Sequence, residues 1–335
     1  MVDQSSGGDV LTRTNNCLFE EAWWLDTTAP AQWGEAVTRA GDEVTGRWCY
    51  VQEELAGLSV VCMPHLTQTA GPWVRSGQRR PARELSEQIQ IVTELLDLLP
   101  PHDLFVQNLH HSQWNLLPLH WKGFRSAARL TYVLNSLDDP DLLWANMLGT
   151  VRTRIRKAER HFTVRHDGGA EDFLPLHRST FGRQGMNVPW PLATVRNVCT
   201  AATKRGQGRV LLAVAPSGRA HAGIVVVWDE RTMYYLLSGS DEYARQHGAV
   251  ALLIWEAIQL AAEVSSSFDF EGSMLPGVER MFRGFGARQV PYLQVWRSNG
   301  KVDALSVTGE LPADTFLRLR ADAVQRGVTI ADPVT

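Results

Sequence analysis

The sequence predicts an α/β (α+β) protein made of two similar halves, each a mixed central sheet flanked by helices. Three observations support this prediction. The same order of strands and helices occurs twice, and amphipathic helices alternate with strands in both copies. The length also fits, because 335 residues that are 44% hydrophobic can bury the cores of two ordinary domains.

The second half contains the fuller copy of this order. Its clearest helix carries an i, i+3, i+4, i+7 apolar stripe from Val250 to Ala261, which is typical of one buried face. The predicted elements are a basic helix near 141–160, a strand at 162–166, helices near 170–184 and 191–206, strands at 208–215, 220–228 and 231–239, a helix at 248–263, a strand at 267–271, a helix at 277–284 and a strand at 290–297.

The first half repeats the later part of this order. The expected elements are strands near 33–39, 43–52, 57–63, 103–108 and 124–134, a helix at 81–99 begun by Pro81, and a short helix near 112–120. We therefore predict a first domain at 1–135 and a second at 136–299. The tail at 300–335, with a strand near 301–307 and a helix near 313–325, is expected to pack back on the first domain. A pocket is expected at the cleft between the domains.

Composition excludes several classes of protein. A net charge of -3 and a pI near 6.4 provide no overall attraction to nucleic acid or to an anionic membrane, so a polyanion would need a local basic patch. The four cysteines are scattered without metal or disulfide spacing, which favours a cytoplasmic protein. The polar start at 1–16 lacks the features of a signal peptide and is expected to be a flexible tail, and no apolar run predicts membrane insertion.

The stretch with most chemical information lies near the end of the second half. A strand that ends at Glu271 places Asp269 and Glu271 on one face. The Gly-rich turn and short basic-aromatic helix that follow contain Phe282 and Arg283. Two carboxylates, a cation and an aromatic ring are therefore predicted to lie together as a reaction centre.

Five separated segments resemble the FemABX family, which is related to the GCN5-related (GNAT) acyltransferases. They are Trp23-Trp24-Leu25, Met63 to Trp73, Leu117 to Phe124, Arg154 to Glu159, and Asp269 to Ala287. The resemblance covers roughly Trp23 to Trp296. It implies tandem GNAT-like domains in the short form of the family, without the coiled-coil arm of some cell-wall members.

Characterised members of this family move an aminoacyl group from aminoacyl-tRNA to an amine, often on a peptidoglycan precursor. The resemblance therefore implies an amide-forming N-acyltransferase that takes an amino acid from aminoacyl-tRNA. Its acceptor would be an amine of a small natural product, such as an antibiotic, or of a cell-wall precursor. The resemblance implies no bound cofactor and permits a monomer. Two alternatives stay open: an N-acyltransferase that uses acyl-CoA or an acyl carrier, and a binding module without catalysis.

Two groups of residues are candidates for binding the donor. Coenzyme A enzymes of the GNAT fold place a Gln or Arg and small residues ahead of a helix whose N–H groups cradle pyrophosphate. Arg245 and Gly248 fit that pattern, but Val250 puts a branched side chain where the backbone should approach phosphate. The basic helix, which includes Arg152 and Arg156, could instead hold tRNA phosphates, with a solvated surface helix as the alternative.

The roles of Phe282 and Arg283 follow from the resemblance, and those of Glu271 and Asp269 from the chemistry of two neighbouring carboxylates. Phe282 and Arg283 resemble a Phe-Lys pair of the family, so the ring is expected to stack on the tRNA end and the cation to steady the carbonyl, although Arg is a planar fork rather than a compact ammonium. The structural alternatives are a core aromatic for Phe282 and an ion pair with Glu279 or Glu271 for Arg283. We assign Glu271 as general base and Asp269 as anchor of the following loop. A substrate-assisted reaction without a protein base also stays open.

The acceptor is expected to contact large rings and nearby polar groups from the first domain, a mixture suited to a polar small molecule. The candidates are Trp23, Trp24, Trp73, Arg75, Gln107, His110 and Asn115. No metal site is predicted. His110 and His111 would point to opposite faces of any strand and have no carboxylate or Cys partners at metal spacing.

Overall fold

The first half of the computed structural model is a sheet flanked by helices; residues 13–76, 80–272, 274–303 and 312–326 are described. Its elements are η1 (Leu18–Glu20), α1 (Ala22–Thr28), β1 (Trp33–Ala40), β2 (Glu43–Leu55), β3 (Leu58–Cys62), β4 (Pro72–Val74), α2 (Pro81–Leu98), β5 (Leu104–Leu109), α3 (Leu117–Trp121) and β6 (Arg125–Asn135).

The second half repeats this organisation with more helices. Its elements are α4 (Pro140–Asn146), α5 (Gly149–Glu159), β7 (Thr163–Gly168), α6 (Ala170–Arg183), α7 (Leu192–Arg205), β8 (Gly208–Val214), β9 (Ala220–Trp228), β10 (Thr232–Ser240), α8 (Glu242–His247), α9 (Ala249–Val264), β11 (Ser267–Asp269), α10 (Pro276–Gly284) and β12 (Arg288–Ser298). Two further helices, α11 (Gly300–Asp303) and α12 (Pro312–Gln325), follow.

Most predicted elements are present, and the differences have local causes. The basic helix expected near 141–160 is divided, because Met147 and Leu148 are extended between α4 and α5. The prediction of a strand near 301–307 is wrong at its start, because residues 300–303 form α11. The rest of that range lies outside the described residues. The predicted class, α/β with a mixed sheet flanked by helices, is confirmed.

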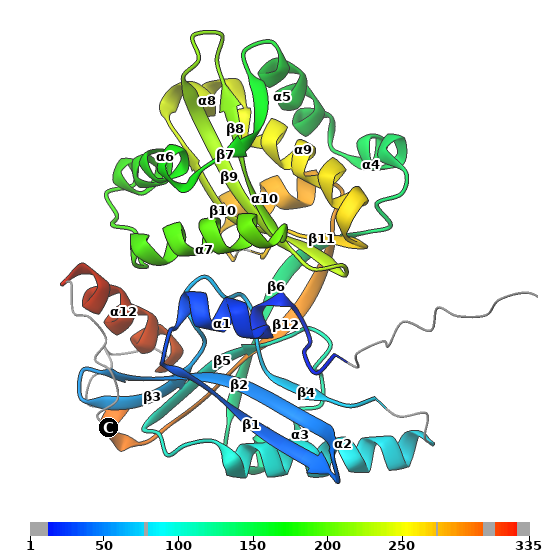
Figure 1. Ribbon diagram of the computed structural model, residues 1–335, viewed down its shortest axis with the longest axis vertical. Helices are drawn as coiled ribbons and strands as arrows, with labels where there is room; N and C mark the ends of the chain where they lie inside the picture. The colour runs from blue at the N-terminus through cyan, green and yellow to red at the C-terminus, as the bar shows by residue number, and fades with distance from the viewer. Residues whose placement is uncertain (1–12, 77–79, 273, 304–311, 327–335) are drawn as a thin grey trace, which may run out of the picture.

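Within the described residues, one sheet of 12 strands runs through both halves, in the order β1-β2-β3-β5-β12-β6-β11-β10-β9-β8-β7, with β4 beside β2. The last strand of each half is exchanged: β12 lies between β5 and β6, and β6 lies between β12 and β11. These two antiparallel strands cross from one lobe to the other (Figure 1). Each half therefore completes its sheet with a strand of the other, while the domain boundary after residue 135 stays a prediction.

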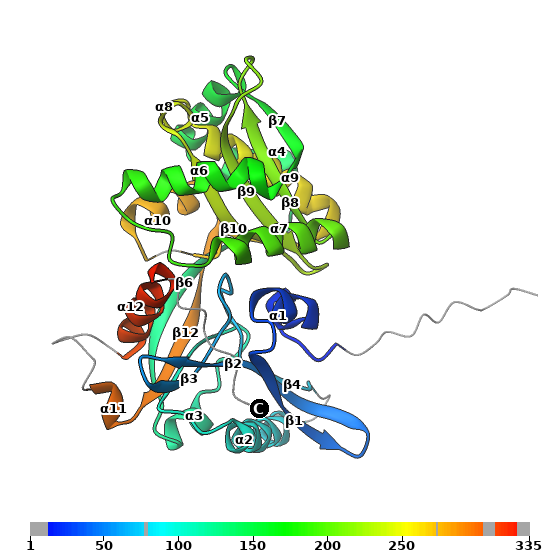
Figure 2. The same ribbon diagram turned by 60° about the vertical axis from the view of Figure 1, so that its left-hand side comes forward.

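Helices cover both faces of this sheet. On one face α12 packs on β2, β5 and β12, and α6 and α7 pack on β8 to β10; Figure 2 shows α12 beside β12. On the other face α2 packs on β1 and β2, and α9 packs on β8 to β11, with α5 against α9 and α10 against α5. We call these the α6 face and the α9 face. Successive residues of a strand alternate between them.

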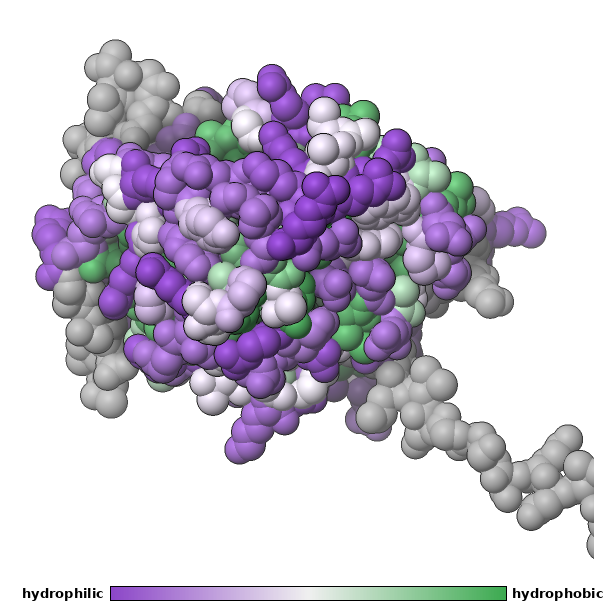
Figure 3. Space-filling view, turned by 90° about the horizontal axis from the view of Figure 1, so that it is seen from above, coloured by the Kyte–Doolittle hydropathy of each residue, from purple (hydrophilic) through white to green (hydrophobic). Residues whose placement is uncertain are grey.

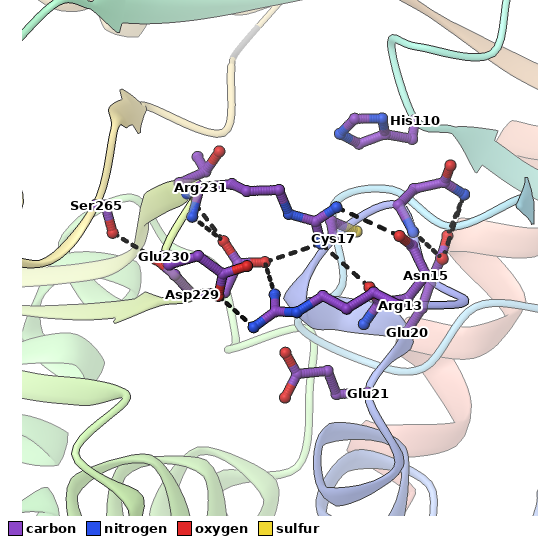
Figure 4. Close-up of polar contacts among 12 residues, drawn as sticks. Arg13, Asn15, Cys17, Glu20, Glu21, His110, Asp229, Glu230, Arg231 and Ser265 are labelled. Atoms are coloured by element: carbon purple, nitrogen blue, oxygen red, sulfur yellow. Dashed lines mark hydrogen bonds and ion pairs between the residues drawn. The ribbon is translucent and has the colours of Figure 1, made fainter. Parts of the chain in front are cut away.

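The start of the described chain connects the two halves. The Arg231 guanidinium donates hydrogen bonds to the backbone oxygen and Oδ1 of Asn15, at 3.3 and 3.2 Å, and to Oδ2 of Asp229 at 3.1 Å (Figure 4). Arg13 forms ion pairs with Asp229 and Glu230. The expected flexible tail is thus wrong for residues 13–16, because charged groups of the second half hold them; residues 1–12 lie outside the described part.

Replacing Gly272 should destabilise the junction of the two halves. Its φ is +64°, and an added Cβ would lie 2.2 Å from the backbone oxygen of Leu130 on β6. Gly272→Ala should therefore lower the free energy of unfolding by about 2–4 kcal/mol, measured by urea denaturation. Gly277→Ala is the control, since nothing lies within 4 Å of its added Cβ. Equal effects of both substitutions would contradict this account.

Candidate active site

A cavity of about 490 Å³ lies between the two halves on the α6 face. The parallel strands β3 and β5 pair only at Val60–Leu104 and Val61–Phe105. The cavity begins beyond these pairs, where the two strands separate. Its walls are Met63 to Thr67 after β3, Val106 and Asn108 of β5, Arg129 of β6, Tyr292 and Gln294 of β12, Pro189 and Trp190 between α6 and α7, and Phe316, Leu317, Arg320 and Ala321 of α12. We call this cavity the cleft.

The floor of the cleft is a chain of hydrogen bonds across three neighbouring strands. Arg129 Nη2 donates to Gln294 Oε1 at 3.0 Å, and Gln294 Nε2 donates to Asn108 Oδ1 at 3.1 Å. Asn108 Nδ2 in turn donates to the backbone oxygen of Gln68 at 2.9 Å. Each side chain fixes the orientation of the next, so the Arg129 guanidinium is held in place by both halves of the protein.

Buried polar atoms that have no hydrogen-bond partner among the described residues gather around the cleft. Three of them belong to its walls: His65 Nε2, Trp190 Nε1 and Arg320 Nε. Glu53, whose Oε2 has no partner among the described residues, forms an ion pair with Arg320 at 2.8 Å through Oε1. The His177 ring stacks on Trp190, and its buried Nε2 also has no partner among the described residues. Buried polar groups are ordinarily satisfied, so this concentration marks the cleft as a place for a polar ligand.

Burial controls the protonation of two residues on the cleft walls. It lowers the pKa of His65 to about 3, with a further contribution from the Arg320 cation, so the imidazole is neutral at pH 7. Burial also raises the pKa of Tyr292 to about 12, opposed by Arg129 and aided by the carboxyl groups of Asp269 and Glu271. The Tyr292 hydroxyl therefore stays protonated and can donate a hydrogen bond.

The two predicted carboxylates lie close together but are not part of the cleft wall. Asp269 Oδ1 accepts hydrogen bonds from Thr131 Oγ1 and, at 2.7 Å, from the backbone N–H of Glu271. Asp269 therefore makes the loop contact expected of an anchor. Glu271 has a φ of +58°, its buried Oε1 has no partner among the described residues, and burial and Asp269 raise its pKa well above the usual range.

Phe282 and Arg283 lie on the α9 face, away from the cleft. The buried Phe282 ring packs against Phe270, with centroids 5.0 Å apart, and Arg283 Nε forms an ion pair with Glu279 Oε1 at 2.7 Å. The predicted cluster of two carboxylates, a cation and a ring is thus divided between two faces. The cause is strand alternation, because Phe270 points away from Asp269. A buried ring is also unavailable for stacking on tRNA in this conformation.

Of the candidate donor residues, Arg245 and Gly248 lie at the start of α9, whereas Arg152 and Arg156 lie on α5. Arg245 forms an exposed ion pair with Glu242 at 3.0 Å. Gly248 has a φ of +80°, and an added Cβ would lie 2.9 Å from the backbone oxygen of Arg154, so α5 occupies the space beside the start of α9. Arg152 donates to two backbone oxygens at the end of α4, and Arg156 lies 5.4 Å from the Trp144 ring.

The candidate acceptor residues of the first half are dispersed. Trp24 is buried and donates to Thr67 Oγ1 at 2.9 Å, so it supports a wall of the cleft. Gln107 lies in the core, where it bonds Trp48 and two backbone oxygens, because it points to the other face from Asn108. Trp23 donates to Glu21 Oε2 and lies beside Arg205.

The remaining acceptor candidates are outside the cleft. Trp73 belongs to β4, which pairs with β2. Arg75 forms ion pairs with Glu43 and Glu87. His110 bonds Ser112, and burial lowers its pKa to about 3. Asn115 lines a separate hollow of about 420 Å³ near α3.

The polar groups of the cleft were not among the predicted site residues. Arg129, Tyr292 and Gln294 come from β6 and β12, and only their strand register brings them together. A partial signal exists for His65, which lies in the segment from Met63 to Trp73 that carries the family resemblance. Among the described residues, no group of three His, Cys, Asp or Glu side chains could bind a metal ion. In the same part of the chain, no helix is both long and apolar enough to cross a membrane.

Comparisons with known proteins agree with this architecture. Residues 145–280 match the family Acetyltransf_6, described as an acetyltransferase (GNAT) domain. The crystal structure of FemX superposes with a TM-score of 0.63 at 13% identity, covering 84% of this chain and 93% of that one. The chain has the FemABX-like form of the GNAT acyltransferase fold. L-PGS from Bacillus licheniformis is also similar, with a TM-score of 0.53 at 10% identity, covering 87% of this chain and 89% of that one. The search of curated protein sequences found no match to the present chain.

Asp269→Asn should remove part of the pH dependence of stability of this FemABX-like fold. Burial raises the pKa of Asp269 from 3.8 to about 6, so the folded protein binds this proton more tightly than the unfolded chain. Wild-type stability therefore falls as pH rises from about 4 to about 6. Asn keeps an Oδ1 acceptor without the charge, so from pH 4 to pH 7 the variant should gain about 1–3 kcal/mol relative to the wild type. Urea denaturation at both pH values measures this difference, and a constant difference would contradict the raised pKa.

Proposed function

We propose that this protein is an N-acyltransferase that transfers an amino acid from aminoacyl-tRNA to an amine held in the cleft. The observation that carries the proposal is the gathering of buried polar groups, unpaired within the described part of the chain, in a cavity between the halves of a GNAT acyltransferase fold. The FemABX resemblance of the sequence and the FemX-like fold support this choice of reaction.

The surroundings of α9 support a tRNA donor over coenzyme A. The backbone of Arg154 on α5 lies against Gly248, where a pyrophosphate would approach the start of α9. The same helix exposes Arg154, Arg156, Lys157 and Arg160, and none of them forms an ion pair with a carboxylate in the described part of the chain. Figure 3 looks down on the end of the molecule that carries α5 and α8, and hydrophilic residues dominate it. Uncompensated cations on such a surface suit phosphates.

The reaction requires attack of the amine nitrogen on the ester carbonyl, breakage of the ester C–O bond, and transfer of the amine proton to the departing ribose oxygen. The protonated Tyr292 hydroxyl is the cleft group best suited to donate a hydrogen bond to the developing oxyanion. Glu271 lies outside the cleft wall, but its pKa is raised by burial and its buried Oε1 has no partner among the described residues, so it is the carboxyl group that could relay the proton.

A second candidate is acyl transfer from coenzyme A, favoured by the match of residues 145–280 to an acetyltransferase domain. The test is incubation of the protein with charged tRNA, acetyl-CoA and a panel of amines, while the consumption of each donor is followed. Consumption of charged tRNA with amide formation supports the proposal. Consumption of acetyl-CoA alone would replace it with the second candidate, and consumption of neither would favour a binding module.

Neutralising the exposed face of α5 should weaken tRNA binding. Arg156→Gln combined with Arg160→Gln should reduce affinity for charged tRNA about tenfold and lower the slope of log K against log salt by about 2, since two phosphate contacts are lost. Filter binding at several salt concentrations measures both quantities. Arg196→Gln is the control, because this exposed arginine of α7 is already paired with Glu171. An unchanged slope in the double variant would exclude α5 from the tRNA site.

A further inference from the structure

We propose that the acceptor is a small amine that also carries one carboxylate, such as an amino acid or a short peptide, and that Arg129 binds this carboxylate. The inference rests on the proposed function, because it names the substrate class of the same cleft. It is independent of the donor, since it concerns only what the cleft binds.

The charges on the cleft walls favour an anion. No Asp or Glu lies among the described residues that line the cleft, whereas Arg129 and Arg320 both do. Arg320 is compensated, because its Nη2 lies 2.8 Å from Glu53 Oε1 and its Nη1 donates to the backbone oxygen of Met63. Arg129 forms no ion pair with a carboxylate in the described part of the chain. Among the described residues, the walls therefore present one positive charge, that of Arg129, without a carboxylate partner.

The geometry of Arg129 suits a planar anion. Its only hydrogen bond among the described residues joins Nη2 to Gln294 Oε1, so Nε and Nη1 remain available. Gln294 is held by Asn108, which fixes the guanidinium before a ligand arrives. Tyr292 lies directly opposite Arg129 in the β6–β12 ladder, and both side chains are half-buried. A fixed guanidinium with free N–H groups is the preferred partner of a carboxylate.

The single charge argues for a carboxylate rather than a phosphate. A phosphate monoester carries nearly two negative charges at pH 7 and would need a second cation. His65, which also lines the cleft, cannot supply that charge, because burial lowers its pKa to about 3 and leaves it neutral. The volume of about 490 Å³ also lies at the lower end of the range for small-molecule sites, which suits an amino acid or short peptide.

The experiment measures ligand binding by calorimetry on the full chain without any donor. The probes are the amino acids and a set of dipeptides, each compared with its carboxamide, together with phosphoethanolamine. The free acid of at least one probe should bind about 10–100-fold more tightly than its carboxamide, the range expected for a charge-assisted hydrogen-bonded pair. Arg129→Gln should abolish this preference, and Arg129→Lys should retain part of it.

Arg125→Gln is the matched control, because Arg125 belongs to the same strand but lines the separate hollow near α3 and not the cleft. It should leave the acid preference unchanged. Thermal unfolding shows whether each variant is folded, and the acid and amide comparison on the wild type stands even if Arg129→Gln does not fold.

Three outcomes would overturn the inference: equal binding of acid and carboxamide, tighter binding of phosphoethanolamine than of every carboxylate, or no binding by any probe. If aminoacyl transfer to an amine is observed while the acid preference is absent, only the inference fails. If the acid preference is present but neither donor is consumed, the proposed function fails and carboxylate binding stands.

Discussion

The antiparallel pairing of β6 with β12 is the interaction on which the rest of this structure depends. It inserts the last strand of each half into the sheet of the other, so the two halves share one hydrogen-bonded ladder. A shared ladder resists rotation of the lobes far better than a side-chain interface, because moving the lobes apart would break backbone hydrogen bonds. The floor of the cleft therefore couples the position of the first half to that of the second half.

This pairing also explains the composition of the cleft. Arg129 from the first half and Gln294 and Tyr292 from the second lie on adjacent strands of one face, within hydrogen-bond or cross-strand distance. The walls above them come from α12 and from the loop between α6 and α7. Polar groups from six segments of the chain thus meet in a cavity where several buried atoms have no partner among the described residues. A polar ligand would supply the missing hydrogen bonds. The same hydrogen bonds would then provide both affinity and specificity.

The order of elements could be predicted because it depends on local patterns. The apolar stripe of α9 and the alternation of the strands around it are visible in the chain, and the structure has them at nearly the predicted positions. The resemblance to the FemABX family likewise indicated the correct fold. The division of the basic helix into α4 and α5 was not predictable, because residues 147 and 148 have no helix-breaking side chain and tertiary packing sets their extended backbone.

The sequence alone thus determined the fold class and the succession of helices and strands, since these depend on neighbours along the chain. The strand predicted to end at Glu271 ends at Asp269, and Glu271 has a φ of +58° instead of an extended backbone. Only the tertiary structure decided which side chains face the cleft. Strand register places Gln107 in the core and Asn108 on the floor, and it separates Phe282 from Asp269. A side chain changes face with each residue of a strand, so the composition of the cleft depends on pairings between segments more than a hundred residues apart, such as Arg129 and Gln294.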